Sequence, residues 1–209
     1  FVFHDFTMAG NQASVRFGRQ VVSWGESTFI QGGINAINPV DVSKLRVAGA
    51  ELKEAFLPVD MIQASFAVNE NLSVEALYLL EFEQTEPDPM GTYFSTNDFA
   101  TLGADFVMLG FGRANEPANF GNCGNVLRFS SDALERASCL QAIPRLPDDY
   151  ADDNGQYGAA LRYFSPTLND TEFGFFFLNY HSRLPLLSGY AVTSTLPNSG
   201  RNIVEYPED

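Results

Sequence analysis

A strict alternation of apolar and polar residues at 72–83 constrains the fold more than any other feature of this sequence. Every second residue is apolar: Leu72, Val74, Ala76, Tyr78, Leu80 and Phe82. The intervening positions include Ser73, Glu75, Glu81 and Glu83. Because successive side chains of a β-strand point to opposite faces, the pattern predicts a strand with one apolar and one acidic face. Tyr78 and Leu80 should therefore share a face, opposite that of Glu81. Such a strand suits a half-solvated antiparallel sheet and equally a barrel wall between lipid and water, and alternation alone does not choose between them.

The same period predicts about six strands along the chain. A hairpin is predicted from 156–164 and 171–183, because the residues between them have the Ser, Pro, Asn and Asp composition of a turn. Three more strands are predicted at 1–8, 13–24 and 61–68, with turns at 9–12 and 69–71. The alternation of 13–24 is imperfect, since Arg19 falls among its apolar positions.

The connections between these strands fall into two length classes. Short turns at 9–12, 69–71 and 165–170 alternate with long segments at 25–57, 84–155 and 184–209. Outer-membrane barrels have short periplasmic turns and long external loops, whereas loops of this length are uncommon inside a compact soluble domain. The expected fold class is therefore all-β, as a segment of an antiparallel transmembrane β-barrel with long external loops, 84–155 among them.

Composition excludes two other classes of protein. Lys and Arg number 12 and Asp and Glu number 26, so the net charge is −14, which disfavours a nucleic-acid partner because phosphate neutralisation needs clustered basic residues. No apolar stretch approaches the roughly 18 residues that a membrane-spanning helix requires. The chain starts at Phe1 and ends on the polar Glu205–Asp209 without a closing apolar strand. We therefore expect residues 1–209 to be a single segment of a longer chain, with any signal peptide upstream.

Two cysteines, Cys123 and Cys139, lie in a stretch rich in Gly, Asn and Ser. Their spacing suits a disulfide that closes a loop in an oxidising compartment, and the alternative is two unpaired thiols. Neither His4 nor His181 lies near the cysteines, and a tetrahedral zinc site needs four ligands at short spacings. We expect no metal.

The most distinctive run is 15–60. It contains, in order, FGRQVVSWGE at 17–26, GGINAINPVD at 32–41, Leu45-Arg46, GAELKE at 49–54 and Leu57-Pro58-Val59. This run resembles the N-terminal signature of domain of unknown function 1302, a family of Gram-negative proteins, and its Gly-Arg-Gln strand is loosely similar to that of alginate-export-type porins. The resemblance implies a large barrel in the outer membrane. It also implies export or uptake of lipid-like or other hydrophobic compounds, alongside an outer-membrane lipoprotein and an inner-membrane efflux pump.

The segment 25–57 also has a physical interpretation of its own. Asn38 is expected to be the N-cap and Pro39 the first residue of a short helix reaching about Leu45, with Asp41 near its positive end. The segment mixes apolar residues with charges: Glu26, Asp41, Lys44, Arg46, Glu51, Lys53 and Glu54. Folded into the lumen, it would narrow the pore and pair its charges with wall residues such as Arg16 and Arg19. These charges either only fix the loop in place or take a direct part in selectivity.

No catalytic machinery is expected. The sequence contains no Gly-x-Ser-x-Gly elbow, phosphate loop or His-Glu-x-x-His helix, and the acidic run 148–155 lacks the residue order of a calcium loop. His181 is expected at the rim of the sheet rather than as a general base. The favoured function is a porin-like outer-membrane channel for small amphipathic or hydrophobic compounds, without cofactors and in contact with membrane lipid. The alternatives are a secreted soluble β-sandwich that binds carbohydrate or a protein surface, and a barrel-embedded hydrolase.

Overall fold

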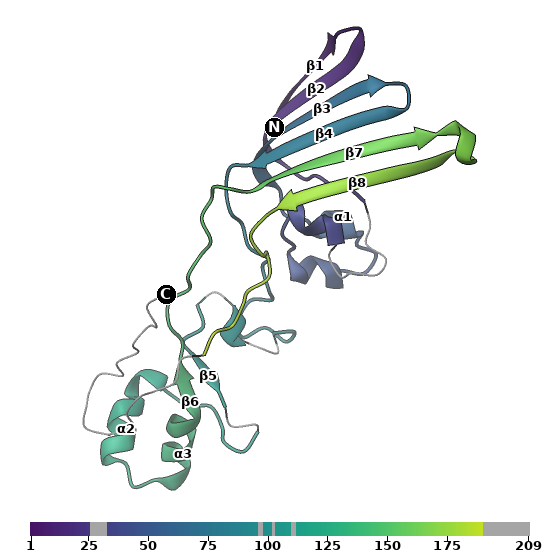
Figure 1. The fold of residues 1–209 in the computed structure, drawn as a ribbon. Helices are drawn as coiled ribbons and strands as arrows, with labels where there is room; N and C mark the ends of the chain where they lie inside the picture. Colours follow the sequence, from purple (N-terminus) through teal and green to yellow (C-terminus); the bar gives the residue numbers. More distant parts are fainter. Residues whose placement is uncertain (26–32, 96–97, 102, 110–111, 190–209) are drawn as a thin grey trace. The chain divides into compact units, whose positions relative to one another are not determined.

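The structure is a computed structural model that describes residues 1–25, 33–95, 98–101, 103–109 and 112–189. It divides into two compact units (Figure 1). Unit 1 consists of Phe1–Pro87 and Asp149–Pro185, and unit 2 consists of Asp88–Asp148 and Leu186–Asp209.

Unit 1 is built on one six-stranded antiparallel sheet with the order β1-β2-β3-β4-β7-β8. Its strands are β1 (Val2–Met8), β2 (Asn11–Gln20), β3 (Val59–Asn69), β4 (Leu72–Leu79), β7 (Tyr157–Ser165) and β8 (Thr171–Asn179). The strands of this sheet lie in chain order, with β5 and β6 of unit 2 inserted between β4 and β7, so the sheet is a meander with one insertion. Among the described residues, β1 and β8 each pair with one strand only, so the sheet is open there.

The short connections all lie at the same end of the sheet (Figure 1). Two of them contain residues with a left-handed backbone: φ is 52° at Ala9 and 86° at Gly10 in the first, and 53° at Asn169 and 55° at Asp170 in the last. A one-turn 3-10 helix, η5 (Pro166–Leu168), leads into the last of these turns. The three predicted turns are therefore present, and β1, β3, β7 and the starts of β4 and β8 lie close to the predicted positions.

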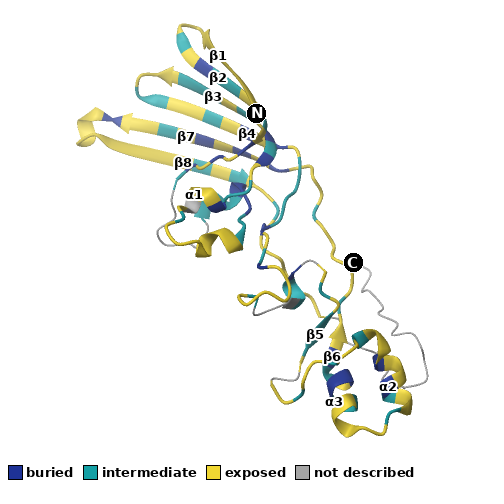
Figure 2. Cartoon of the chain, turned by 180° about the vertical axis from the view of Figure 1, so that it is seen from behind, coloured by how far each residue is buried: buried dark blue, intermediate teal, exposed yellow. Residues whose placement is uncertain are grey.

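The register gives the sheet two chemically different faces. We name one the aromatic face; it contains Phe17, Ile62, Val74, Tyr78, Tyr157, Leu161, Tyr163, Phe173, Phe175 and Phe177. We name the other the polar face; across its middle lie Asp5, Gln12, Ser14, Arg16, Gln63, Ser65, Ser73, Glu75, Arg162 and Glu172. All ten aromatic-face residues are exposed, and exposed positions recur along the strands in Figure 2.

The core of unit 1 forms on the polar face, towards the end where the long connections leave. Its buried residues are Val22, Trp24, Ile37, Val59, Met61, Leu77, Leu79 and Ala160, with Ile34, Phe176 and Leu178 packed against them. Residues before β3 thus cover one end of this face. We name the connection 21–57 the cover segment.

Two strands are shorter than predicted. β2 ends at Gln20, so Trp24 is not part of the strand but leaves it and packs on the sheet. β4 ends at Leu79, so the faces of Leu80 and Glu81 are not set by strand pairing, although Tyr78 does lie on the aromatic face. In both cases, hydrogen bonds to groups outside the sheet ladder take the place of the backbone pairing that the alternation predicts beyond the strand end.

The predicted helix of the cover segment is displaced. The described part of the segment contains three short helices: η1 (Gly33–Ile37), η2 (Val42–Arg46) and α1 (Leu52–Ala55). The N-cap of η2 is Asp41, whose side chain accepts from the Ser43 amide, and not Asn38 as predicted. Asn38 is unavailable as a cap because its side chain bonds to three backbone groups elsewhere.

Unit 2 holds a small two-stranded sheet and two helices. β5 (Phe106–Met108) pairs antiparallel with β6 (Ala142–Pro144). Two 3-10 turns, η3 (Asp98–Ala100) and η4 (Phe120–Asn122), precede α2 (Cys123–Phe129) and α3 (Ala133–Gln141). The predicted long connection 84–155 therefore has its own secondary structure. The fold class is mostly antiparallel β with short helices, and none of the described helices is long and apolar enough to cross a membrane.

Candidate functional site on the polar face

Glu75 lies at the centre of the polar face. Its Oε1 accepts hydrogen bonds from Trp24 Nε1 and from Gln63 Nε2, each at 2.5 Å. Its Oε2 lies 3.6 Å from Arg162 Nη1, and Arg162 Nε lies 4.0 Å from Glu172 Oε1. The residues come from β3, β4, β7, β8 and the cover segment, so one carboxylate joins the sheet to its cover.

Trp24 occupies a slot on the same face. A Cβ at position 158 would lie 2.8 Å from Trp24 Cη2 and 2.6 Å from Leu178 Cδ2, so only glycine leaves room for the indole there. The ring of Phe176 lies 6.0 Å from that of Trp24, centroid to centroid. Arg162 donates from Nη2 to the Trp24 carbonyl at 3.3 Å, and its guanidinium carbon lies 5.7 Å from the Phe176 ring centroid. Trp24 is only 3% exposed.

Asn38 fixes the path of the cover segment. Its Oδ1 accepts from the Val22 amide at 2.9 Å, and its Nδ2 donates to the carbonyls of Gln20 at 3.3 Å and of Leu57 at 3.0 Å. One buried amide thus ties the end of β2 to the residues that lead into β3. This contact stops β2 at Gln20 and directs the following residues across the polar face.

Beyond the cover, the polar face is hollow. A hollow of about 530 Å³ lies near the turn ends of β1 to β4. It is lined by the polar residues Asp5, Thr7, Gln12, Ser14, Ser65 and Ser73 and by the apolar residues Phe6, Ala13, Phe66 and Ala67. Carboxylate, amide and hydroxyl groups therefore face this space, whereas the opposite face of the same strands is apolar.

The charges predicted to reach the wall pair locally instead. Lys44 Nζ lies 3.5 Å from Asp41 Oδ2, and Lys53 Nζ lies 2.6 Å from Glu51 Oε2. Glu54 accepts from the Glu51 amide at 3.4 Å. Hydrogen bonds from the hydroxyl and amide of Ser43, together with Lys44, hold the pKa of Asp41 below its ordinary value. Of the two remaining residues, Arg46 is exposed at the end of η2, and Glu26 lies outside the described residues.

The two wall arginines also differ from expectation. Arg16 lies on the polar face opposite Gln63, and among the described residues no ion pair joins it to Asp41. Arg19 lies at the end of β2 and binds Glu83 at 2.7 Å and Glu81 at 3.2 Å. Its position next to the strand end explains why it breaks the alternation of 13–24: a charged side chain there reaches the rim of the sheet.

The rim contains a second polar group around Arg183. This residue is 5% exposed, donates from Nη1 to the Glu83 carbonyl at 3.1 Å and lies 5.3 Å from the Phe82 ring centroid. Burial lowers the pKa of Arg183. His181 packs edge-on against Phe82, with ring centroids 6.2 Å apart, and its amide bonds to Gln156. The predicted rim position of His181 agrees with this placement.

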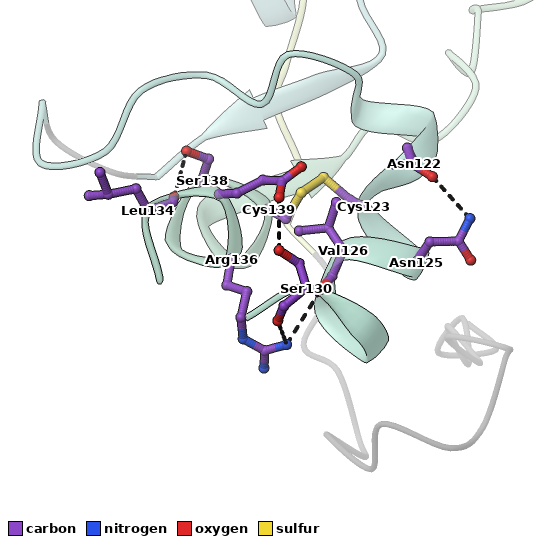
Figure 3. The surroundings of a disulfide bond; sticks show 10 residues. Asn122, Cys123, Asn125, Val126, Ser130, Leu134, Arg136, Ser138 and Cys139 are labelled. Atoms are coloured by element: carbon purple, nitrogen blue, oxygen red, sulfur yellow. Dashed lines mark hydrogen bonds between the residues drawn. A yellow bond between two sulfur atoms is a disulfide. The ribbon is translucent and has the colours of Figure 1, made fainter. Parts of the chain in front are cut away.

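In unit 2, Cys123 and Cys139 form a disulfide with Sγ atoms 1.99 Å apart (Figure 3). It joins the first residue of α2 to the last turn of α3, between β4 and β7 along the chain as predicted. Arg136 reaches back from α3 to the carbonyls that end α2, including those of Val126 and Ser130 (Figure 3). The bond and this arginine hold the two helices as a hairpin.

The residues that meet on the polar face combine groups that can hold a polar molecule. A carboxylate, a guanidinium and an amide fixed beside an indole can orient a polar group and set a local electric field. Within the described ranges, no three His, Cys, Asp or Glu side chains are grouped to hold a metal ion.

Comparison with known proteins gives one match. No curated protein and no solved structure matches the chain. The family model described as "Protein of unknown function (DUF1302)" matches residues 1–209, the whole of the chain. The chain therefore belongs to the DUF1302 family.

Proposed function

We propose that this chain forms part of the wall of a porin-like channel in the outer membrane of a Gram-negative cell. The channel passes small amphipathic or hydrophobic compounds. Its wall is the six-stranded sheet of unit 1, with the aromatic face towards lipid and the polar face towards the lumen.

The observation on which this proposal rests is the chemical contrast between the two faces. Phe175 is 65% exposed and Phe177 58% exposed, and both belong to one continuous apolar surface over β2, β3, β4, β7 and β8. Water-soluble proteins rarely expose apolar patches of more than a few hundred Å², and large ones mark an interaction with a protein or a membrane. Alternation of lipid-facing apolar and lumen-facing polar residues is the pattern of a membrane barrel.

The open edges fit the same proposal. Inside a bilayer, every backbone N–H and C=O group must be bonded within the protein, so a spanning sheet has to close on itself. We therefore propose that further strands pair with the free edges of β1 and β8. The cover segment then lies in the lumen, where Trp24 and Ile37 narrow the passage.

The proposed partners rest on the family resemblance alone. They are membrane lipids around the aromatic face, an outer-membrane lipoprotein, and an inner-membrane efflux pump that would supply substrate for export.

Site-directed spin labelling of the intact protein in lipid vesicles tests the orientation of the sheet. Nitroxides at Ile62, Leu161 and Phe175 on the aromatic face should collide with oxygen dissolved in lipid. Nitroxides at Ser65 and Ser73 on the polar face should collide with a water-soluble nickel chelate. Equal access of the chelate to both sets would refute the proposal.

A further inference from the structure

The slot that holds Trp24 has the shape of a site for a flat aromatic ring. Gly158 forms its floor, and any Cβ there would lie 2.8 Å from Trp24 Cη2 and 3.0 Å from the Phe177 carbonyl oxygen. Phe176 and Leu178 pack beside it, and the neighbouring residue on this face of β7 is the small Ala160. The slot therefore accepts a planar ring through an opening made by the absence of a side chain.

The slot also has hydrogen-bonding chemistry for such a ring. Glu75 Oε1 accepts the single N–H of the indole at 2.5 Å, with Arg162 on the far oxygen of the same carboxylate. Beside it, the buried Oε1 of Gln63 accepts no hydrogen bond from any described residue. The site thus offers acceptors to a ligand that combines an aromatic body with an N–H or O–H donor.

Trp24 packs in the same buried cluster as Ile37, but its indole hydrogen bond goes to the sheet and not to the cover segment. Asn38 and the fully buried Ile37 fix the segment at the end of the sheet. Trp24 precedes them, and its polar contacts to the sheet are the Glu75 bond and the Arg162 bond to its carbonyl. Loss of the indole contacts would leave the Asn38 anchor intact.

We propose, on the basis of the channel function above, that this slot is a binding site for small planar aromatic compounds with one hydrogen-bond donor, the class of phenols and indoles. Trp24 is an internal competitor that leaves the slot when the ligand enters. The site defines the amphipathic substrate class of the channel, with Glu75 as the acceptor and Gly158 as the shape filter.

Trp24 is the single tryptophan of residues 1–209, and subtracting the emission of Trp24→Phe from that of wild type isolates its signal in the full-length protein. In detergent-solubilised wild-type protein, phenol should shift the Trp24 emission saturably to longer wavelength, because the displaced indole meets water. Cyclohexanol has the same hydroxyl without a flat ring and should leave the emission unchanged. An equal response to both compounds, or to neither, would overturn the proposal.

Variants separate the slot from unspecific partitioning into micelles. Binding of 4-fluorophenol is measured by fluorine NMR on wild type and on Trp24→Ala, which lacks the competitor. The affinity should rise about tenfold in Trp24→Ala, since binding no longer requires a minor, open state of the site. Adding Glu75→Leu should remove that gain, whereas Glu70→Leu, in the exposed β3–β4 turn, should keep it.

Equal affinities in wild type and Trp24→Ala would contradict the proposal, as would a gain that survives Glu75→Leu. These measurements need neither a bilayer nor conduction. They can therefore fail while the spin-label result holds, or succeed while it fails, so the two proposals are tested independently.

Discussion

Asn38 shows how one residue can set the path of a long connection. It is 3% exposed and bonds to the backbone of Val22, Gln20 and Leu57. Replacing it by Leu, which has a similar size, would leave one buried N–H and two buried carbonyls without this partner. A single unsatisfied buried group costs about 1–3 kcal/mol. We therefore expect Asn38→Leu to lower the free energy of unfolding by about 3 kcal/mol, measured by urea titration.

Asn125 provides the control for this prediction. It is exposed, and its side chain donates to the nearby side chain of Asn122. Asn125→Ala should change the free energy of unfolding by less than about 0.5 kcal/mol, the usual range for surface substitutions. If Asn38→Leu were equally mild, the anchoring role assigned to Asn38 would be wrong.

Asp41 makes the stability of the cover segment depend on pH. Its pKa is lowered, chiefly by the hydrogen bond from the Ser43 hydroxyl, so the folded state favours the carboxylate. A lowered pKa stabilises the fold above the unfolded-state value of about 3.9, and this contribution is lost as the pH falls through the folded-state value.

Loss of this cap should therefore matter at neutral pH and not in acid. Asp41→Ala should cost about 1 kcal/mol at pH 7, as for other N-caps. The difference from wild type should shrink as the pH falls below about 4. Urea titrations across this range measure it, and Ser43→Ala should show a smaller loss with the same pH dependence. A difference that does not change with pH would contradict the assignment.

At the scale of elements, strands could be predicted because their signal is local. The alternation at 72–83 and the Ser-Pro-Thr-Leu-Asn-Asp turn at 165–170 are properties of adjacent residues. β4 begins where the alternation predicts a strand, and β7 and β8 are joined by the predicted turn. The ends of β2 and β4 could not be predicted in this way. They depend on contacts with residues far along the chain, such as the Val22 amide on Asn38 and the Phe82 amide on Asp153.

The candidate site was less predictable for the same reason. The charged residues of the cover segment were expected to pair with the barrel wall. Lys44 pairs with Asp41 instead, because residues close together in the chain meet more easily than residues on distant strands. Glu75 and Arg162 meet only once the β4–β7 register is known, because they lie on diagonal positions of adjacent strands. Trp24, followed directly by Gly25, stood within the distinctive run 15–60, but nothing in the sequence paired it with Glu75.

The cover segment should restrict flow through the proposed channel. Replacing 23–36 by a Gly–Ser chain of equal length removes Trp24 but keeps Ile37 and Asn38, which anchor the end of the sheet. We expect a higher single-channel conductance in planar bilayers, because the apolar cover of the polar face is lost. The matched variant Lys53→Gln, in an exposed pair with Glu51, should conduct like wild type. An unchanged conductance in a correctly folded replacement would show that the segment is not a constriction.

The α2–α3 hairpin should depend on its disulfide. Cys123 and Cys139 are separated by 16 residues, and closing a loop of this length contributes about 3 kcal/mol in the chain-entropy estimate. The double variant Cys123→Ser/Cys139→Ser should make 112–148 sensitive to protease while the sheet of unit 1 stays resistant. Mass spectrometry of unreduced wild-type peptides checks the bond itself. Free thiols in protein prepared without reductant would contradict the pairing.

At the scale of the whole molecule, the charged residues lie away from the apolar surface of the sheet. Acidic residues outnumber basic ones by 26 to 12, yet the middle of the aromatic face contains no charge. Among the described strand pairs, Arg19 with Asp60 is the charged pair on that side, and it lies at the end of the strands. A band free of charge between polar ends matches the polarity profile of a bilayer.

Two adjacent residues of β2, one on each face of the sheet, test this match at the same depth in the bilayer. Val15 lies on the aromatic face opposite Ala64, and Ser14 lies on the polar face opposite Asp5, lining the hollow of about 530 Å³. Arginine near the middle of the lipid-facing side of a membrane barrel costs about 2–4 kcal/mol. We expect Val15→Arg to make folding into lipid vesicles less favourable by about that amount, because its guanidinium would face hydrocarbon. Ser14→Arg should have a much smaller effect, since the hollow has room for the side chain and Asp5 can pair with it. Folding titrations in vesicles give both values, and equal costs for the two variants would show that the aromatic face does not meet lipid.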